Sequence, residues 1–462
     1  MHRATTLVVL LVLGFATVVT QTSCWKKTRA PLRTEVQAFY PVRLQYYLSS
    51  YEQHGRKNPA WDKAMRTLIE ETTYHTYSEE RPLPESLVDA FADLDKANCN
   101  DPYFLSLSAL YLHVRITQPH PWASYAKAHL AMRASDYGPM FKFATAHGAA
   151  KEFYHQTDPN QRRTFFKLQA EAFEYLLEAM SDPGVTDELI AAPAENYFDW
   201  SQASEEPLQE IQSRATRLHA AVRQYRPDRA FMLRMLGSVE IALAWGSRSS
   251  DWASEVTPEG WAGFAEHLSV AEILLERAWA LQPNSRTARY MMSVELGQHY
   301  GRERMELWFQ RAMELNPAGD TACYSKLHYL RPRWHGSHEE MLQFATQCVE
   351  NPAWSGRVSL VLAHAMDSYI GDYPKSDQPR LWQNPKIWAL VKKSYDAYLK
   401  KYPDDEAARH DYLEAAYRSA AWDDFTAQFK KIDSIKLIYI PKNKLDRMMN
   451  DYAEHLAAQA QQ

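Results

Sequence analysis

The sequence predicts an all-α fold, an α-solenoid in which antiparallel helix pairs stack on one another. The first observation is a repeat: residues 276–283 read ERAWALQP, and residues 310–317, 34 positions later, read QRAMELNP. The second is that apolar residues recur at helical spacing along most of the chain. The third is that only 15 of the 462 residues are glycine. Helices need little glycine, whereas folds rich in tight turns or in glycine-rich phosphate loops need more.

Helices are expected in close succession from residue 34 onward. Pro59 opens the second helix, and Pro84 followed by Glu85 opens the third, because both residue types suit a first helical turn. A break at 98–102 separates the third helix from the fourth and makes a helix–turn–helix pair. The helices expected before residue 250 span 34–54, 59–77, 84–98, 102–111, 121–135, 139–156, 159–180, 208–225 and 228–246.

A seam between domains, or a long loop, is expected at 181–207. Helix breakers lie among acidic residues there, namely Pro183, Gly184, Pro193 and Pro207. The seam divides the chain into an N-terminal helical region at 34–180, a repeat region at 208–352, and a C-terminal region of helical repeats and a cap at 353–462.

The repeat region follows a polar loop at 247–260. The helices expected after this loop span 261–281, 286–300, 303–315, 319–330 and 337–350. A looser region comes next, because four helix breakers lie close together at Gly371, Pro374, Pro379 and Pro385. After Pro403 we expect two helices that split near Ala421, a short extended piece at 435–440, and a final polar helix at 442–460 that caps the solenoid.

The recurring segment resembles the second helix of the tetratricopeptide repeat (TPR) family. In that pattern a small Ala lets two helices approach closely, a large apolar residue fills the groove, and Pro ends the helix. The matching positions are Arg277, Ala278, Leu281 and Pro283, which recur as Arg311, Ala312, Leu315 and Pro317. In the first helix, Leu296-Gly297 and Tyr300 match part of the family pattern, and the Trp of that pattern is absent in register.

This resemblance covers about 260–352, with a weaker echo at 395–433. The Trp-containing stretch at 244–271 also resembles uncharacterised bacterial TPR-like proteins that place such a loop before their repeats. The TPR resemblance implies a scaffold whose concave groove binds a protein or peptide partner. It implies no catalytic activity.

The N-terminus predicts export. Met1-His2-Arg3 is short and basic, and residues 5–20 form an apolar run without a charge, shorter than the roughly 20 residues that span a bilayer. We therefore expect a signal peptide or membrane anchor at 1–24, a linker at 25–33, and a protein of the periplasm or cell envelope. Two alternatives stay open. Cys24 permits lipidation, although Gln21 departs from the aliphatic residue typical of bacterial lipoprotein signals, and the basic residues after the run permit an uncleaved anchor.

Charge and motifs exclude several classes of function. The net charge is −5 without a basic patch, which argues against a nucleic-acid partner. No segment matches Walker A, GxGxxG, HExxH or GxSxG, so we predict no catalytic residue and no cofactor. The nearest metal-like cluster consists of His335, His338, Glu339 and Glu340. We interpret it as the acidic first turn of a helix, not as a metal site.

Three tryptophans around a polar segment form the most distinctive candidate site. Trp245, Trp252 and Trp261 surround Arg248 in the sequence, and aromatic rings beside polar groups can stack sugars or clamp a peptide. The alternative is that the rings pack into the core and cover a joint of the solenoid. In both cases we expect an ordered loop, because three exposed tryptophans leave a large apolar area in water.

Two of the four cysteines, Cys323 and Cys348, are expected to lie close together in the fold. Cys323 lies near the start of one expected helix, and Cys348 lies near the end of its partner helix. In an antiparallel hairpin these two points face each other, so a Cys323–Cys348 disulfide is predicted for an exported protein. The alternative is two buried free thiols that serve as small apolar residues.

Three functions compete at this level. The first is an exported or membrane-tethered TPR-like scaffold for a protein or peptide. The second is a glycan-binding protein of the cell envelope, which rests on the aromatic content of the chain. The third is an α-helical-toroid enzyme that acts on polysaccharide, which requires acidic residues at the mouth of a helical barrel. The absence of catalytic motifs favours the scaffold.

Overall fold

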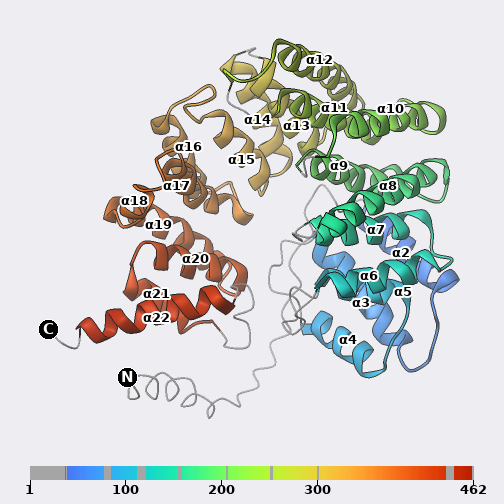
Figure 1. Cartoon of the computed structure of the whole chain (residues 1–462), viewed down its shortest axis with the longest axis horizontal. Helices are drawn as coiled ribbons and strands as arrows, with labels where there is room; N and C mark the ends of the chain where they lie inside the picture. The colour runs from blue at the N-terminus through green and yellow to red at the C-terminus, as the bar shows by residue number, and fades with distance from the viewer. Residues whose placement is uncertain are drawn as a thin grey trace. The chain divides into compact units, whose positions relative to one another are not determined.

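The computed structural model describes residues 37, 39–77, 85–111, 121–154, 159–203, 206–249, 253–298, 301–432 and 442–459. These residues form helices joined by short turns, with no strand in the described ranges (Figure 1). The all-α prediction is therefore confirmed. The segment at 1–24, the linker at 25–33 and the extended piece at 435–440 lie outside the described residues.

The described residues between 37 and 249 form ten helices, and all of them except α9 follow the expected ranges. In chain order they are α2 (Tyr40–His54), α3 (Asp62–Tyr77), α4 (Glu85–Lys96), α5 (Pro102–Tyr111), α6 (Pro121–Arg133), α7 (Pro139–Tyr154), α8 (Pro159–Ser181), α9 (Asp187–Ala203), α10 (Leu208–Tyr225) and α11 (Ala230–Arg248).

The described residues from 253 onward continue in the same way and include the 3₁₀ helix η3. The elements are α12 (Pro258–Leu281), α13 (Ser285–Gln298), α14 (Arg302–Leu315), α15 (Asp320–Tyr329), α16 (His338–Glu350), η3 (Gly356–Leu360), α17 (Val361–Gly371), α18 (Gln378–Trp382), α19 (Pro385–Lys401), α20 (Glu406–Arg418), α21 (Trp422–Phe429) and α22 (Lys442–Gln459). Within the described residues, no helix is both long and apolar enough to cross a membrane.

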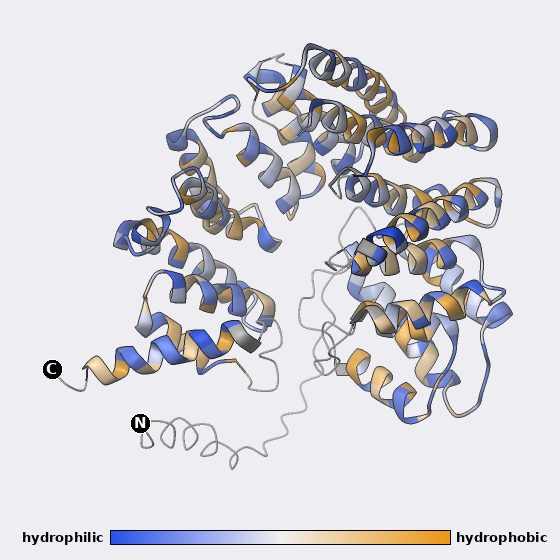
Figure 2. Ribbon diagram, viewed as in Figure 1, coloured by the Kyte–Doolittle hydropathy of each residue, from blue (hydrophilic) through white to orange (hydrophobic). Residues whose placement is uncertain are grey.

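Most helices pack against the next helix in the sequence, and many also pack against the helix after that one. Each of the pairs α7–α8, α11–α12 and α13–α14 packs together, and so do α9 with α11, α11 with α13, and α13 with α15. The contact between every second helix joins one hairpin to the next. Figure 2 shows apolar residues on the helix sides that face neighbouring helices, as expected for amphipathic helices stacked in pairs.

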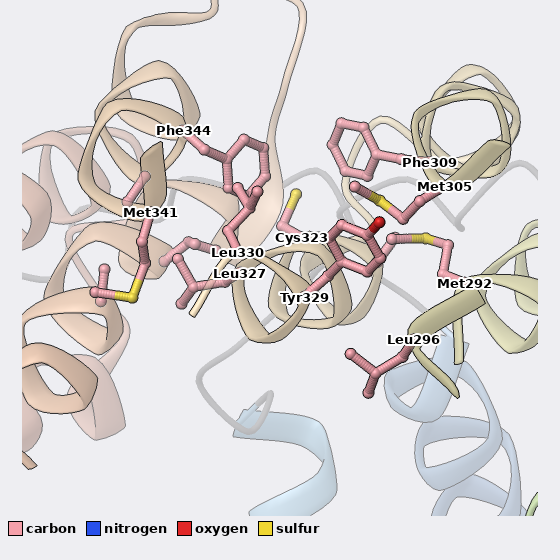
Figure 3. Close-up of a cluster of buried hydrophobic side chains, with 14 of the residues drawn as sticks. Met292, Leu296, Met305, Phe309, Cys323, Leu327, Tyr329, Leu330, Met341 and Phe344 are labelled. Atoms are coloured by element: carbon pink, nitrogen blue, oxygen red, sulfur yellow. The ribbon is translucent and has the colours of Figure 1, made fainter. Parts of the chain in front are cut away.

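The two repeated segments use their small residues in the same way. Ala278 on α12 and Ala312 on α14 are 0% and 1% exposed, and each proline of the repeat comes two residues after its helix ends. Figure 3 shows the core that results, where side chains of α13, α14, α15 and α16 meet. The labelled residues include Met292, Met305, Cys323 and Phe344, all of which are buried.

The prediction of a loop over 181–207 is wrong for residues 187–203, because these residues form the helix α9. Pro193 lies inside this helix and removes one backbone hydrogen bond. Two physical factors outweigh that loss. Asp187 and Glu188 occupy the first turn, where acidic residues suit the helix dipole. Most of the apolar face is also buried, including Ile190 and Tyr197, each 0% exposed.

The looser region expected after residue 352 is also more helical than the breakers indicated, since it contains η3, α17, α18 and the start of α19. Pro385 begins α19 instead of interrupting it, and the Asn384 side chain accepts a hydrogen bond from the backbone N–H of Lys386 at 3.0 Å. Proline in a first turn has no helical hydrogen bond to lose. The expected split of the last pair is confirmed, because α21 begins directly after Ala421.

Candidate functional site

The predicted tryptophan site is a cluster built around the guanidinium of Arg248, the last residue of α11. Its central carbon lies 5.7 Å from the ring centroid of Trp245, 5.1 Å from that of Trp261 and 5.6 Å from that of Trp334. Arg248 itself is 8% exposed. We call these four residues the Arg248 cluster. Trp252 was also predicted to belong to this site, but it lies outside the described residues.

The tryptophan rings of the Arg248 cluster contact one another and a neighbouring phenylalanine. Trp245 packs edge-on against Trp334 at 5.6 Å and against Phe264 at 5.1 Å. Trp261 is the most open ring, at 36% exposed. Trp245 and Trp334 pack against the core where α11, α12 and the turn after α15 meet, whereas Trp261 is exposed, and a ligand-binding role of these residues stays a prediction. Trp334 was missed because it follows a different helix, and no local pattern links it to Arg248.

A second site, which sequence reasoning missed, is a cavity of about 170 Å³ lined by three arginines. It lies where the starts of α13 and α15 meet η3 and the end of α19. We call it the arginine pocket. Its lining consists of Ser285, Arg286 and Arg289 from α13, Ala312 and Asn316 from the end of α14, Ala318, Gly319, Asp320, Thr321 and Ala322 around the start of α15, Gly356 and Arg357 from η3, and Tyr398 and Tyr402 from the end of α19.

Local structure shapes the walls of the arginine pocket. Asn284 accepts a hydrogen bond from the backbone N–H of Arg286 at 3.0 Å and so helps to start α13. Gly356 has a φ of +58°, and a Cβ on it would lie 3.1 Å from the Cβ of Ala318. Only glycine combines that backbone conformation with so close an approach. The N–H of Gly356 donates to the hydroxyl of Tyr402 at 2.9 Å, which ties η3 to the end of α19.

The three arginines are held in different ways. Arg286 Nη1 pairs with the buried Glu195 of α9 at 3.0 Å, and Arg357 Nη1 pairs with Asp405 at 3.3 Å. The guanidinium of Arg289 lies over the ring of Tyr290, 4.2 Å from its centroid. Asp320 is the acidic residue in the lining, Glu195 compensates Arg286 and Asp405 compensates Arg357, so the attraction of the pocket for an anion rests mainly on Arg289.

Glu195 is a buried carboxylate beside the pocket whose ionised form two arginines stabilise. Burial opposes ionisation of this carboxylate, which is 2% exposed, but Arg234 and Arg286 outweigh burial and lower its pKa below the usual value. Arg286 and Arg289 are three residues apart and therefore share one face of α13. That spacing is the signal in the sequence that could have indicated the pocket.

The residues of the metal-like cluster do not converge. His338 pairs with Asp372 at 3.0 Å, whereas the Nε2 atom of His335 lies 2.8 Å from the carbonyl oxygen of Leu296. Glu340 pairs with Arg302 at 3.0 Å, and its backbone N–H donates to Ser337 at the start of α16. The described residues contain no group of three or more His, Cys, Asp or Glu side chains placed to hold a metal ion.

Cys323 and Cys348 do lie together in the core, both as buried thiols. A hydrogen bond with Cys348, followed by burial, raises the pKa of the Cys323 thiol far above its usual value. The sulfur of Cys323 is also 3.7 Å from the Sδ atom of Met313. The two cysteines are therefore neighbours, as the hairpin argument expected, and the disulfide stays a prediction.

No protein-family model matches this chain, and no curated protein does either.

Proposed function

We propose that this protein is a TPR-like scaffold, exported or tethered to a membrane, which binds an acidic segment of a protein or peptide partner in the arginine pocket. The observation that carries the proposal is the meeting of Arg286, Arg289 and Arg357 in one cavity. The pairing of the helices and the 34-residue repeat support the scaffold part of the proposal. The basic N-terminus and the apolar run at 5–20 support export.

Guanidinium chemistry favours a carboxylate as the group that enters the pocket. A guanidinium presents several N–H donors in one plane, which match the two oxygens of a carboxylate. A cavity of about 170 Å³ has room for an acidic side chain or a chain-terminal carboxylate. The helix α13 begins at Ser285 in the lining, and the positive end of its dipole adds to the attraction.

The two other functions have less support from the geometry. A glycan-binding protein needs aromatic faces open to a sugar. In the Arg248 cluster, however, Arg248 lies over all three rings, and Trp261 offers the largest exposed area. A polysaccharide-cleaving enzyme needs two carboxylates placed about a bond. The arginine pocket contains one carboxylate, that of Asp320.

Replacement of Arg289 tests the proposal, because it leaves the ion pairs of Glu195 and Asp405 intact. We expect Arg289→Glu to weaken binding of a fluorescein-labelled hexaglutamate peptide at least about tenfold, since one charge-assisted hydrogen bond is worth roughly 1.5–3 kcal/mol. Fluorescence anisotropy at fixed ionic strength measures the affinity. A pull-down from envelope extract with the same variant then reports on the natural partner.

Arg223→Glu is the matched control, because Arg223 is exposed on α10 and does not line the pocket. It changes the net charge of the protein equally and is expected to leave the affinity unchanged. Equal weakening by both variants would mean that the peptide senses only overall charge. Unchanged binding by Arg289→Glu would exclude the arginine pocket as the binding site.

A further inference from the structure

A cavity of about 250 Å³ lies among α2, α3, α5, α6, α7 and the start of α9, in the N-terminal part of the chain. Aromatic rings from four of these helices line it, so we call it the aromatic cavity. The rings are those of Tyr46 and Tyr47 on α2, Tyr103 on α5, Tyr125 on α6, and Phe141 and Phe143 on α7. The arginine pocket shares no lining residue with it.

The rings of the aromatic cavity hold one another in place. Phe141 stacks on Tyr46 with centroids 5.7 Å apart, meets Tyr47 edge-on at 5.7 Å, and meets Tyr103 edge-on at 4.8 Å. Such contacts fix the ring orientations before any ligand arrives. A ligand that enters this cavity therefore loses little affinity to reorganisation of the protein.

The threonine hydroxyl groups in the lining are already used by the protein itself. Thr72 donates to the carbonyl oxygen of Leu68 at 2.7 Å, Thr73 to that of Ile69 at 2.6 Å, and Thr145 to that of Phe141 at 2.7 Å. Each of these bonds runs to the residue four positions earlier in the same helix. The threonines consequently have no need of a polar ligand, and what they add to the lining is largely methyl surface.

The charge in the lining is compensated as well. Arg43 is the only lining residue with a formal charge at neutral pH among those described. Its Nε donates to Glu188 at 2.6 Å, its Nη2 lies 2.5 Å from the other oxygen of the same carboxylate, and its side chain is 10% exposed. Burial also raises the pKa of Tyr46 and Tyr125, so their phenols stay neutral. The cavity thus offers aromatic rings, methyl groups and the neutral phenol hydroxyls of its tyrosines, without net charge.

We propose that the aromatic cavity binds a small, neutral, apolar molecule. The size of this molecule follows from the volume of the aromatic cavity. A protein cavity of about 150 Å³ lined by apolar side chains holds benzene, so a cavity of about 250 Å³ takes a molecule of roughly ten non-hydrogen atoms. A fused two-ring aromatic has this size, and its faces match the rings of the lining. This site is separate from the partner-binding role proposed above.

Naphthalene is the probe for the first experiment, with 2-naphthoate as the charged molecule of nearly the same shape. We expect equilibrium dialysis against the full chain to show one naphthalene per protein. We expect 2-naphthoate to bind at least about tenfold more weakly, because the cavity offers no uncompensated cation to a carboxylate. Equal affinity for the two probes, or no binding of naphthalene, would overturn the proposal.

Ala144→Phe tests the location of the site. Ala144 is an exposed residue of α7 that lines the cavity, so a phenyl group there occupies the cavity without replacing a buried side chain. We expect at least about a tenfold loss of naphthalene affinity, with unchanged circular dichroism. Ala457→Phe on α22 is the control, since Ala457 is exposed and does not line the cavity. Its affinity is expected to equal that of the wild type.

Leu110→Asp provides a second test that does not depend on how Ala144→Phe folds. Leu110 is 57% exposed and lines the same cavity. A carboxylate there must lower the affinity for naphthalene, because the apolar ligand would then contact a charge. Retained affinity in both Ala144→Phe and Leu110→Asp would place naphthalene elsewhere and exclude the aromatic cavity.

Discussion

At the scale of single residues, buried charges in this protein are held by partners that lie far away in the sequence. Glu195 on α9 is 2% exposed and accepts hydrogen bonds from Arg234 at 2.7 Å, Arg286 at 3.0 Å and Tyr290 at 3.2 Å. Removal of one partner of such a buried charge is strongly destabilising, because an unpaired charge remains in the interior. The position of Arg286 in the pocket is thus tied to the stability of the fold.

Glu295 on α13 is the buried acid whose environment leads to a pH-dependent prediction. It is 1% exposed, and burial raises its pKa from 4.5 to about 7, although Arg304 at 3.1 Å opposes the shift. The folded protein therefore holds a proton that the unfolded chain releases between these two values. The contribution of Glu295 to the free energy of unfolding therefore falls as pH rises from 4.5 to about 7.

We expect Glu295→Gln to remove this pH dependence, because glutamine stays neutral at every pH. At pH 8 the variant should be more stable than the wild type by about 1 kcal/mol or more, since the cost of a buried carboxylate is gone. Urea unfolding at a series of pH values measures both effects. Glu303→Gln, at an exposed position of α14, is the control. A slope unchanged by Glu295→Gln would contradict the prediction.

At the scale of helices, the starts of many elements are determined by nearby side chains. Thr257, Ser337 and Asp405 each precede a helix and accept a hydrogen bond from a backbone N–H in its first turn. These residue types are the preferred helix N-caps. Pairing of the helices depends on a different feature, the small residues that let two helix backbones approach closely.

Gly297 on α13 allows such an approach to α12. A Cβ on Gly297 would overlap Leu268 and lie 2.7 Å from Phe264, and both of these residues are buried on α12. We expect Gly297→Ala to lower the free energy of unfolding by about 1–3 kcal/mol through overpacking, despite the higher helix propensity of alanine. Urea unfolding compares the variant with the wild type.

Gly371 at the end of α17 is the control for this change, because a Cβ there would meet no atom within 4 Å. Gly371→Ala is expected to leave stability unchanged or to raise it slightly, by up to about 1 kcal/mol. A similar effect of both substitutions would mean that close packing of α12 and α13 does not explain Gly297.

At the scale of the whole chain, contacts between a helix and the second helix after it join neighbouring hairpins into shared buried clusters. The largest buried cluster runs from Ile241 on α11 to Ala415 on α20 and includes Cys323 and Cys348. The redox state of these two thiols depends on where the whole protein resides, because disulfides persist in oxidising compartments. Their chemistry therefore reports on the proposed export.

For the exported protein we expect a Cys323–Cys348 disulfide. The two residues are 25 positions apart, and closing a loop of that size stabilises the fold by roughly 3 kcal/mol. Mass spectrometry of non-reduced tryptic peptides from native envelope detects the bridge. The same chain made in a reducing cytosol is the control and should give two free thiols. Alkylation of both thiols in the envelope sample after unfolding would refute the disulfide and favour a body that faces the cytoplasm.

The all-α class, the packing of helices in pairs and most helix boundaries could be predicted from the sequence, because periodicity, caps and prolines act within a few residues. The helix expected at 208–225 is α10, with the same bounds, and the buried Ala278 and Ala312 lie where the repeat placed them. The proximity of Cys323 and Cys348 also followed from hairpin geometry alone.

Contacts between helices that lie far apart in the sequence could not be predicted from local sequence patterns. Burial of α9 overrode the breaker Pro193, which no local rule anticipates. Trp334 reached Arg248 because the turn after α15 packs near the end of α11. Arg357 joined Arg286 and Arg289 in one cavity through the stacking of α13, α15 and η3. Local sequence determines where each helix begins and which of its faces is apolar. The packing of those faces determines which residues meet in one site.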